Sequence, residues 1–274
     1  MIRPLLEYGN VLFINCTAAQ AKQIENVQIC AGSVISAAMN TTSHAKILKE
    51  LGYDTLESRR TEHQLTLFYK MKHNLTPEYI TKLVPSNRDD GTRYTLRRPF
   101  DHKLIATRTE QYRKSFLPSA ITKWNSLPTT IKSAENLSIF KSRYAKQYHT
   151  KNVKYFSYGD KKSNVTLSRF RMGFSKLNSD LFIRNLIPSP KCSCGYNKED
   201  PRHFFLECQA YAAQRILLLD RIMDHIALNA KLKYNLNNTS ILNLLIWGMP
   251  LENIDFNKNL LDIIYQFIDG TDRF

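Results

Sequence analysis

Three cysteines and one histidine lie within one seventeen-residue window in the last third of the chain. They are Cys192, Cys194, His203 and Cys208, in the spacing C-x-C-x8-H-x4-C. Three thiolates and one imidazole make a complete tetrahedral ligand set for Zn²⁺, and four protein ligands leave no open position for a substrate. The spacing therefore predicts a structural zinc site and not a catalytic one. The alternative is three buried thiols beside an unrelated histidine.

The two halves of this ligand set need different local structures. The first two cysteines are expected on a turn whose backbone is relaxed by Gly195. His203 and Cys208 fall at the start of a helix predicted over 203–229. Because five residues exceed one helical turn, both side chains face a common point only if the helix adjusts locally.

Cysteine usage and the start of the chain indicate a reducing compartment. The chain has five cysteines, and the odd number argues against a disulfide framework. The remaining two, Cys16 and Cys30, lie far from the cluster. The first residues contain neither a secretory signal nor an apolar run of membrane-spanning length. We therefore expect the nucleus or the cytoplasm as location, and no membrane partner.

Positive charge is concentrated in the middle of the chain. The net charge is +15, and residues 81–164 carry 18 Lys and Arg against 6 Asp and Glu. Within this stretch, basic and aromatic residues interleave, as expected where cations contact phosphates and rings stack on bases. RNA or DNA is the predicted partner, and a basic surface kept for solubility is the alternative. The predicted contacts are Arg93, Arg97, Arg98, Lys103 and Arg108.

Motifs for catalysis are missing. The chain has no Gly-rich phosphate loop and no G-x-S-x-G turn, so no catalytic residue and no small-molecule substrate is predicted. Asp89 and Asp90 form an adjacent carboxylate pair. They lie in a polar loop, whereas a polymerase metal pair needs a hydrophobic strand and a further carboxylate.

Hydrophobic periodicity predicts a mainly α fold. Four regions follow from it: a helical bundle over 1–84, a basic and aromatic connector with helices over 85–150, a polar linker over 151–164, and a small helical zinc-binding domain over 165–274. The individual helices are expected at 18–39, 44–51, 56–73, 111–125, 134–147, 165–173, 176–186, 203–229, 239–247 and 257–269, with a short one after Pro77.

Several segments, in their order along the chain, resemble one protein family. They read RPLLEYG at 3–9, YRKSFLP at 112–118, WNSLP at 124–128 and HFFLEC at 203–208. Together they resemble the carboxy-terminal part of jockey-like non-LTR retrotransposon reverse transcriptases. The resemblance implies a thumb-like helical region, a connector and a CCHC zinc-binding segment. It also implies binding of template RNA or target DNA.

The family's catalytic parts are expected outside this sequence. Its palm aspartates and its endonuclease would precede residue 3, so the chain is predicted not to be an enzyme. Met1 directly before the thumb-like region suggests a truncated copy or a separate gene piece. Two alternatives stay open. The chain is an accessory part of an RNA-directed DNA polymerase that works only with an upstream catalytic core, or it is an inert retroelement remnant.

Overall fold

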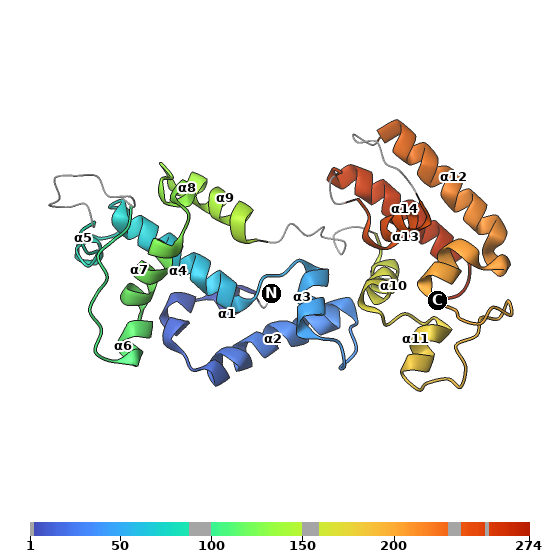
Figure 1. Cartoon of the computed structure of the whole chain (residues 1–274), viewed down its shortest axis with the longest axis horizontal. Helices are drawn as coiled ribbons and strands as arrows, with labels where there is room; N and C mark the ends of the chain where they lie inside the picture. Colours follow the sequence, from blue (N-terminus) through green and yellow to red (C-terminus); the bar gives the residue numbers. More distant parts are fainter. Residues whose placement is uncertain (1–2, 88–99, 150–158, 230–236, 250–251) are drawn as a thin grey trace. The chain divides into compact units, whose positions relative to one another are not determined.

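The computed structural model describes residues 3–87, 100–149, 159–229, 237–249 and 252–274. These residues form helices and connecting loops (Figure 1), and within them β structure amounts to a single bridge between Asn87 and His102. The predicted mainly α class is therefore confirmed. No helix in the described ranges is both long and apolar enough to cross a bilayer.

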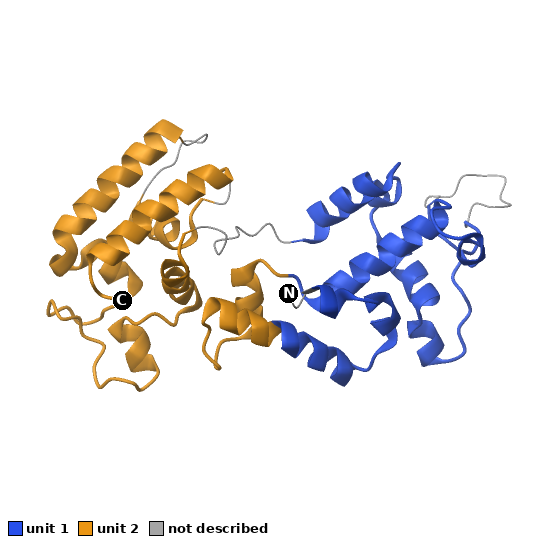
Figure 2. Cartoon of the chain, turned by 180° about the vertical axis from the view of Figure 1, so that it is seen from behind, with its two compact units in different colours: residues 1–28, 54–150 blue, residues 29–53, 151–274 orange. Residues whose placement is uncertain are grey.

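The chain divides into two compact units, coloured in Figure 2. Unit 1 comprises residues 1–28 and 54–150, and unit 2 comprises residues 29–53 and 151–274. The long helix α2, Ala18–Ser36, contributes its first part to unit 1 and its remainder to unit 2. The division differs from the expected regions, because residues 29–53 cluster with the carboxy-terminal half and not with the rest of 1–84.

Unit 1 is built around the helix α4, Leu56–Lys72, which packs against α7 and α9. Phe68, Tyr69, Trp124 and Phe140 are each at most 1% exposed and form its aromatic core. The Trp124 and Phe140 rings stack with centroids 5.8 Å apart. The other helices of unit 1 are α1 Arg3–Glu7, a 3-10 turn Asn10–Asn15, α5 Glu78–Thr81, α6 Glu110–Lys114, α7 Phe116–Ser126, α8 Thr129–Lys132 and α9 Leu137–Tyr148.

Two helix predictions in unit 1 need correction. The helix expected over 111–125 is interrupted at Ser115, whose extended backbone separates α6 from α7. The helix expected from 134 begins instead after Asn136, whose side chain accepts a hydrogen bond from the Ile139 amide at 2.9 Å. Asn136 therefore serves as the N-terminal cap of α9.

Unit 2 buries an apolar core between α10, Lys161–Met172, and the last helices of the chain. Phe204, Phe205 and Leu260 lie at its centre with no measurable exposure. Its other elements are α3 His44–Leu51, α11 Asn178–Ile183, a π-helical turn His203–Glu207, a 3-10 turn Gln209–Tyr211, α12 Ala212–Asn229, α13 Asn238–Trp247 and α14 Ile254–Gly270.

The predicted linker over 151–164 is too long at its carboxy-terminal end. Helix α10 starts at Lys161, because Asp160 caps it by accepting hydrogen bonds from the amides of Lys162 and Ser163 at 2.8 and 3.1 Å. Asn164 is 2% exposed and accepts a hydrogen bond from the Tyr265 hydroxyl at 2.7 Å. Polar residues that suggested a linker are thus buried against α14.

A buried ion pair joins α3 to α10 within unit 2. The Arg171 guanidinium donates to the Glu50 carboxylate at 2.6–2.9 Å, and the two side chains are 1% and 2% exposed. Arg171 also donates to the Ile246 carbonyl at 3.0 Å. This pair explains why a segment more than a hundred residues away in sequence belongs to unit 2.

Candidate metal centre

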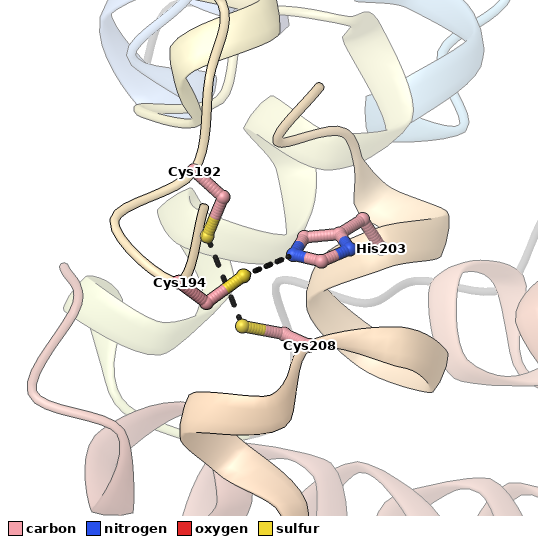
Figure 3. A group of neighbouring side chains, drawn as sticks. All are labelled: Cys192, Cys194, His203 and Cys208. Carbon is pink, nitrogen blue, oxygen red and sulfur yellow. Dashed lines mark hydrogen bonds between the residues drawn. The ribbon is translucent and has the colours of Figure 1, made fainter. Parts of the chain in front are cut away.

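The four residues predicted to bind zinc converge on one point. Their ligand atoms all lie within 4.8 Å of one another. Cys192 Sγ is 3.8 Å from Cys208 Sγ, and Cys194 Sγ is 3.3 Å from His203 Nε2 (Figure 3). The structure therefore brings together, from a loop and a helical turn, the ligand set that the spacing predicts.

A tight turn presents the first two ligands. The Gly195 amide donates to the Cys192 carbonyl at 3.0 Å, and the Cys192 amide donates to the Tyr196 carbonyl at 2.9 Å. Gly195 has φ of +92°, which a residue with a β-carbon rarely adopts. The turn that Gly195 was predicted to relax thus folds back on itself and directs both thiols to the same side.

A π-helical turn presents the other two ligands. The Cys208 amide donates to the His203 carbonyl at 2.7 Å, a bond that spans five residues. In an α-helix residues five apart point in different directions, whereas the wider π turn brings them back to one side. Asp200 fixes its start by accepting a hydrogen bond from the His203 amide at 2.9 Å. The expected continuous helix over 203–229 is therefore wrong in its first part, since α12 begins only at Ala212.

Three of the four ligands are shielded from solvent. Cys192, His203 and Cys208 are 5%, 2% and 0% exposed, whereas Cys194 is half-buried. The Tyr196 ring stacks on the His203 imidazole with centroids 4.3 Å apart and planes 4° from parallel. This stacking orients the imidazole so that Nε2 faces the sulfurs, while Nδ1 makes no hydrogen bond to the described protein atoms.

Burial and hydrogen bonding move the thiol pKa values in opposite directions. Desolvation raises the pKa of Cys208 to about 12, so this thiol stays protonated unless a cation replaces its proton. At Cys194 a backbone hydrogen bond from Tyr196 is the main cause that lowers the pKa. A metal ion would stabilise the thiolate at both positions.

The spacing of the donor atoms fits a tetrahedral metal ion. Zinc–sulfur bonds of about 2.3 Å at the tetrahedral angle place two sulfurs about 3.8 Å apart. The observed Cys192–Cys208 separation is 3.8 Å. Four neutral protein groups at these distances otherwise gain only weak sulfur hydrogen bonds. The cluster can therefore hold a metal ion.

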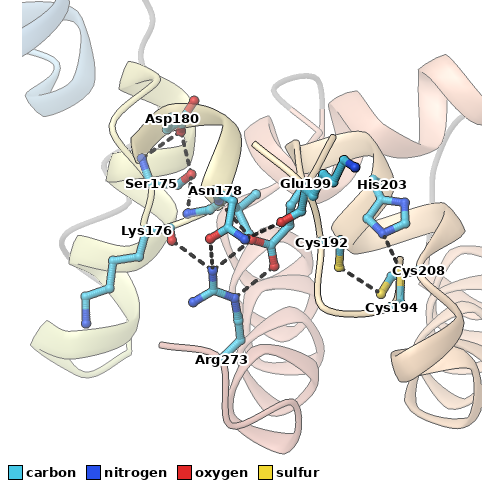
Figure 4. Close-up of polar contacts among 12 residues, drawn as sticks. Ser175, Lys176, Asn178, Asp180, Cys192, Cys194, Glu199, His203, Cys208 and Arg273 are labelled. Carbon is cyan, nitrogen blue, oxygen red and sulfur yellow. Dashed lines mark hydrogen bonds and ion pairs between the residues drawn. The ribbon is translucent and has the colours of Figure 1, made fainter. Parts of the chain in front are cut away.

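Residues that the sequence did not single out hold the cysteine turn in place. Glu199, 2% exposed, accepts hydrogen bonds from Arg273 Nε and Nη2 at 2.9 and 2.8 Å and from the Asn178 amide at 2.8 Å (Figure 4). Its own amide donates to the Pro190 carbonyl at 2.8 Å. A lone glutamate paired with an arginine 74 residues away carries no spacing signal, so sequence reasoning could not find this support.

The predicted nucleic-acid contacts divide into two groups. Arg93, Arg97 and Arg98 lie outside the described residues, as does the Asp89–Asp90 pair. Lys103 and Arg108 are exposed and make no ion pair with described residues.

Hydrogen bonds hold the start of the segment that carries Lys103 and Arg108. The Asn125 side chain accepts from the His102 amide at 3.0 Å and donates to the His102 carbonyl at 2.9 Å. The Trp124 indole donates to the Phe100 carbonyl at 3.0 Å. Tyr112, which follows on α6, is 47% exposed.

Not every cation of the middle region faces solvent. Lys132 forms a buried ion pair with Asp101 at 2.6 Å, and both side chains are at most 4% exposed. Lys123 is half-buried and donates to Gln64 at 2.9 Å, and desolvation lowers its pKa. In the described part of 81–149, eight Lys and Arg are nevertheless exposed, against two exposed Glu. The positive excess is therefore a property of the surface.

Comparison with known proteins gives one short similarity. Over 45 residues the chain is 51% identical to the Retrovirus-related Pol polyprotein from type-1 retrotransposable element R1 3 of Nasonia vitripennis. The match covers 16% of this chain and 12% of that polyprotein. No protein-family model and no solved structure matches the chain. The similarity supports an origin in a non-LTR retrotransposon, whereas the narrower assignments, jockey-like and carboxy-terminal, stay predictions.

Proposed function

We propose that this chain is a non-catalytic nucleic-acid-binding module of a retroelement-derived protein, from the carboxy-terminal part of its reverse transcriptase, with a structural zinc ion in unit 2. The observation that supports it most is the excess of exposed cations over exposed carboxylates in the middle region. Eight exposed cations against two exposed carboxylates attract a polyanion, and release of condensed counterions drives such binding.

The zinc ion would have a folding role in this proposal. Cys192, Cys194, His203 and Cys208 would hold it, and all four positions of a tetrahedral ion would then be filled by protein. When bound, zinc supplies a cross-link between the cysteine turn and the π turn. Tyr196 and the Glu199–Arg273 pair orient the two turns so that their donors face inward.

A salt series tests the nucleic-acid role. Fluorescence anisotropy of the zinc-loaded full chain with labelled single-stranded RNA and DNA should give an affinity that falls steeply as salt rises. Replacing four cations by alanine should reduce the log–log slope by about 0.7 for each phosphate contact, or roughly 3 in total. The four are Arg93, Arg97, Arg98 and Lys103.

The matched control replaces four exposed cations of unit 2 and should leave the slope nearly unchanged. Lys49, Arg202, Arg221 and Lys258 serve, since all four are exposed and lie on other elements. Weak binding that does not depend on salt would overturn the proposal and favour an inert remnant.

The similarity to a Pol polyprotein favours one second function. In it the module assists an RNA-directed DNA polymerase and acts only beside an upstream catalytic core. Adding the chain in trans to a related polymerase core that lacks this region tests it. Increased primer extension would support this role. Unchanged extension would contradict it and leave the proposal of a binding module as it stands.

A further inference from the structure

Unit 2 contains a cavity of about 480 Å³ whose charged side chains are all basic. It is formed by one face of α10, the loop before α11 and the last residue of the sequence. No carboxylate side chain lines it. The lining residues are Ala37, Lys161, Lys162, Val165, Thr166, Arg169, Ser175, Lys176 and Phe274.

The face of α10 toward this cavity follows helical spacing. Lys161, Lys162, Val165 and Arg169 line the cavity, whereas Asn164 and Leu167, on the other side of the helix, are buried in the core. Eight residues along a helix cover about 12 Å, so the cations at 161 and 169 lie at two ends of a stripe. Such a stripe can contact more than one phosphate of an extended strand.

Arg169 differs from the other arginines of this region. Arg171 pairs with Glu50, Arg273 pairs with Glu199, and Arg184 donates to the Asp180 and Ser175 carbonyls at 2.7 and 2.8 Å. The half-buried Arg169 guanidinium has neither ion pair nor hydrogen bond in the described structure. A guanidinium in this position gains energy from an anion that enters the cavity.

Hydrogen bonds hold the loop at Ser175 and Lys176, which lines the cavity together with Arg169, and they leave the Lys176 side chain free. The Arg273 guanidinium donates to the Lys176 carbonyl at 3.1 Å, and the Ser175 amide donates to Asp180 at 2.9 Å. The exposed Lys176 side chain extends away from the Glu199–Arg273 contacts (Figure 4). The Glu199 and Asp180 carboxylates are thus both engaged in hydrogen bonds of their own.

We propose that this cavity binds the phosphodiester backbone of a single-stranded nucleic acid, with Arg169 and Lys176 as phosphate contacts. The inference rests on the proposed nucleic-acid function and adds a second binding site to it, in unit 2. Val165 and Phe274 supply apolar wall for a base or ribose. The cavity is large enough for one nucleotide of a single strand. A duplex does not fit, because its bases are paired between the two strands and cannot enter the cavity.

The test compares two double variants of the zinc-loaded full chain. Arg169→Ala with Lys176→Ala should reduce the log–log salt slope for single strands by about 1.4, because two phosphate contacts are lost. Arg221→Ala with Lys258→Ala removes the same charge from exposed positions outside the cavity and should leave the slope unchanged. Arg169→Lys should retain most of the slope. Oligo(rU) and oligo(dT) distinguish RNA from DNA as the strand.

Lysine acetylation followed by mass spectrometry supplies a readout that needs no variant. Bound oligonucleotide should protect Lys161 and Lys176 and leave Lys258 reactive. An unchanged slope in the 169/176 variant, or unprotected Lys176 in a chain that binds nucleic acid, overturns this inference and leaves the proposed function standing. Failure of the unmodified chain to bind any single strand at low salt overturns both.

Discussion

Replacing Cys208 by alanine should separate the effect of metal binding on unit 2 from the effect of packing. Cys208 is fully buried, so removing its sulfur leaves a small void that costs about 1 kcal/mol with or without metal. Its loss also removes one of four ligands. Structural zinc contributes about 10–16 kcal/mol of apparent binding free energy in small zinc domains, so a three-ligand site retains far less of it.

The expected magnitude follows from mass action. At free zinc 1,000 times the dissociation constant, binding stabilises the folded state by about 4 kcal/mol. The free energy of unfolding of the unmodified chain should therefore be about 4 kcal/mol higher in zinc than in chelator. For Cys208→Ala the two values should be almost equal. Cys30→Ala is the matched control, because Cys30 also lies in unit 2 and is exposed.

Each unit contains one tryptophan, which makes the assay specific. In a Trp124→Phe background, urea unfolding followed by fluorescence reports unit 2 through Trp247. Metal analysis of the same samples should give one zinc per chain for the unmodified protein and for Cys30→Ala. Equal zinc content and equal chelator sensitivity in Cys208→Ala and the unmodified chain would refute the four-ligand site.

Three further predictions follow from the structure. Zinc binding should release a proton from Cys208 at pH 7 and at pH 8 alike, because both lie far below the metal-free pKa of about 12; calorimetry in two buffers of different ionisation enthalpy measures it. Glu50→Gln should destabilise unit 2 by about 3–5 kcal/mol, because it leaves the buried Arg171 charge without its partner. Glu50→Leu with Arg171→Met should cost little, because it removes both charges. Urea unfolding of both variants measures this, and equal losses would contradict it. Primer extension by the isolated chain should stay at background with magnesium or manganese, and extension abolished by Asp89→Asn would show that the acidic loop is catalytic.

The part of the metal site that could be predicted is its chemistry. Ligand types and their clustering within seventeen residues are visible in the sequence, and so is the difficulty that His203 and Cys208 stand five residues apart. The solution, a π turn, could not be predicted, because a turn of this kind depends on what surrounds it. Here Asp200 fixes its start, and the two phenylalanines inside it are buried in the core of unit 2.

Helix positions were predictable where local signals decide them. Helix α3 has the bounds expected, 44–51, and Gly52 adopts φ of +63° at its end. The predictions failed where a polar residue is buried by tertiary contacts, as at Asn164, or where another residue supplies the cap, as at Asn136. The grouping of 29–53 with unit 2 was also out of reach, since it depends on the long-range pair of Glu50 and Arg171.

The same distinction governs the charge argument. A count along the sequence treats every cation of 81–164 alike, although Lys132 is enclosed with Asp101 and contributes to folding instead of to the surface potential. In unit 2 the sequence gives no reason to separate Arg169 from Arg171, two residues apart. The structure places Arg171 against a buried carboxylate and Arg169 in an open basic cavity. Substitution of Arg171 should therefore reduce stability, whereas substitution of Arg169 should reduce the salt dependence of binding without unfolding the chain.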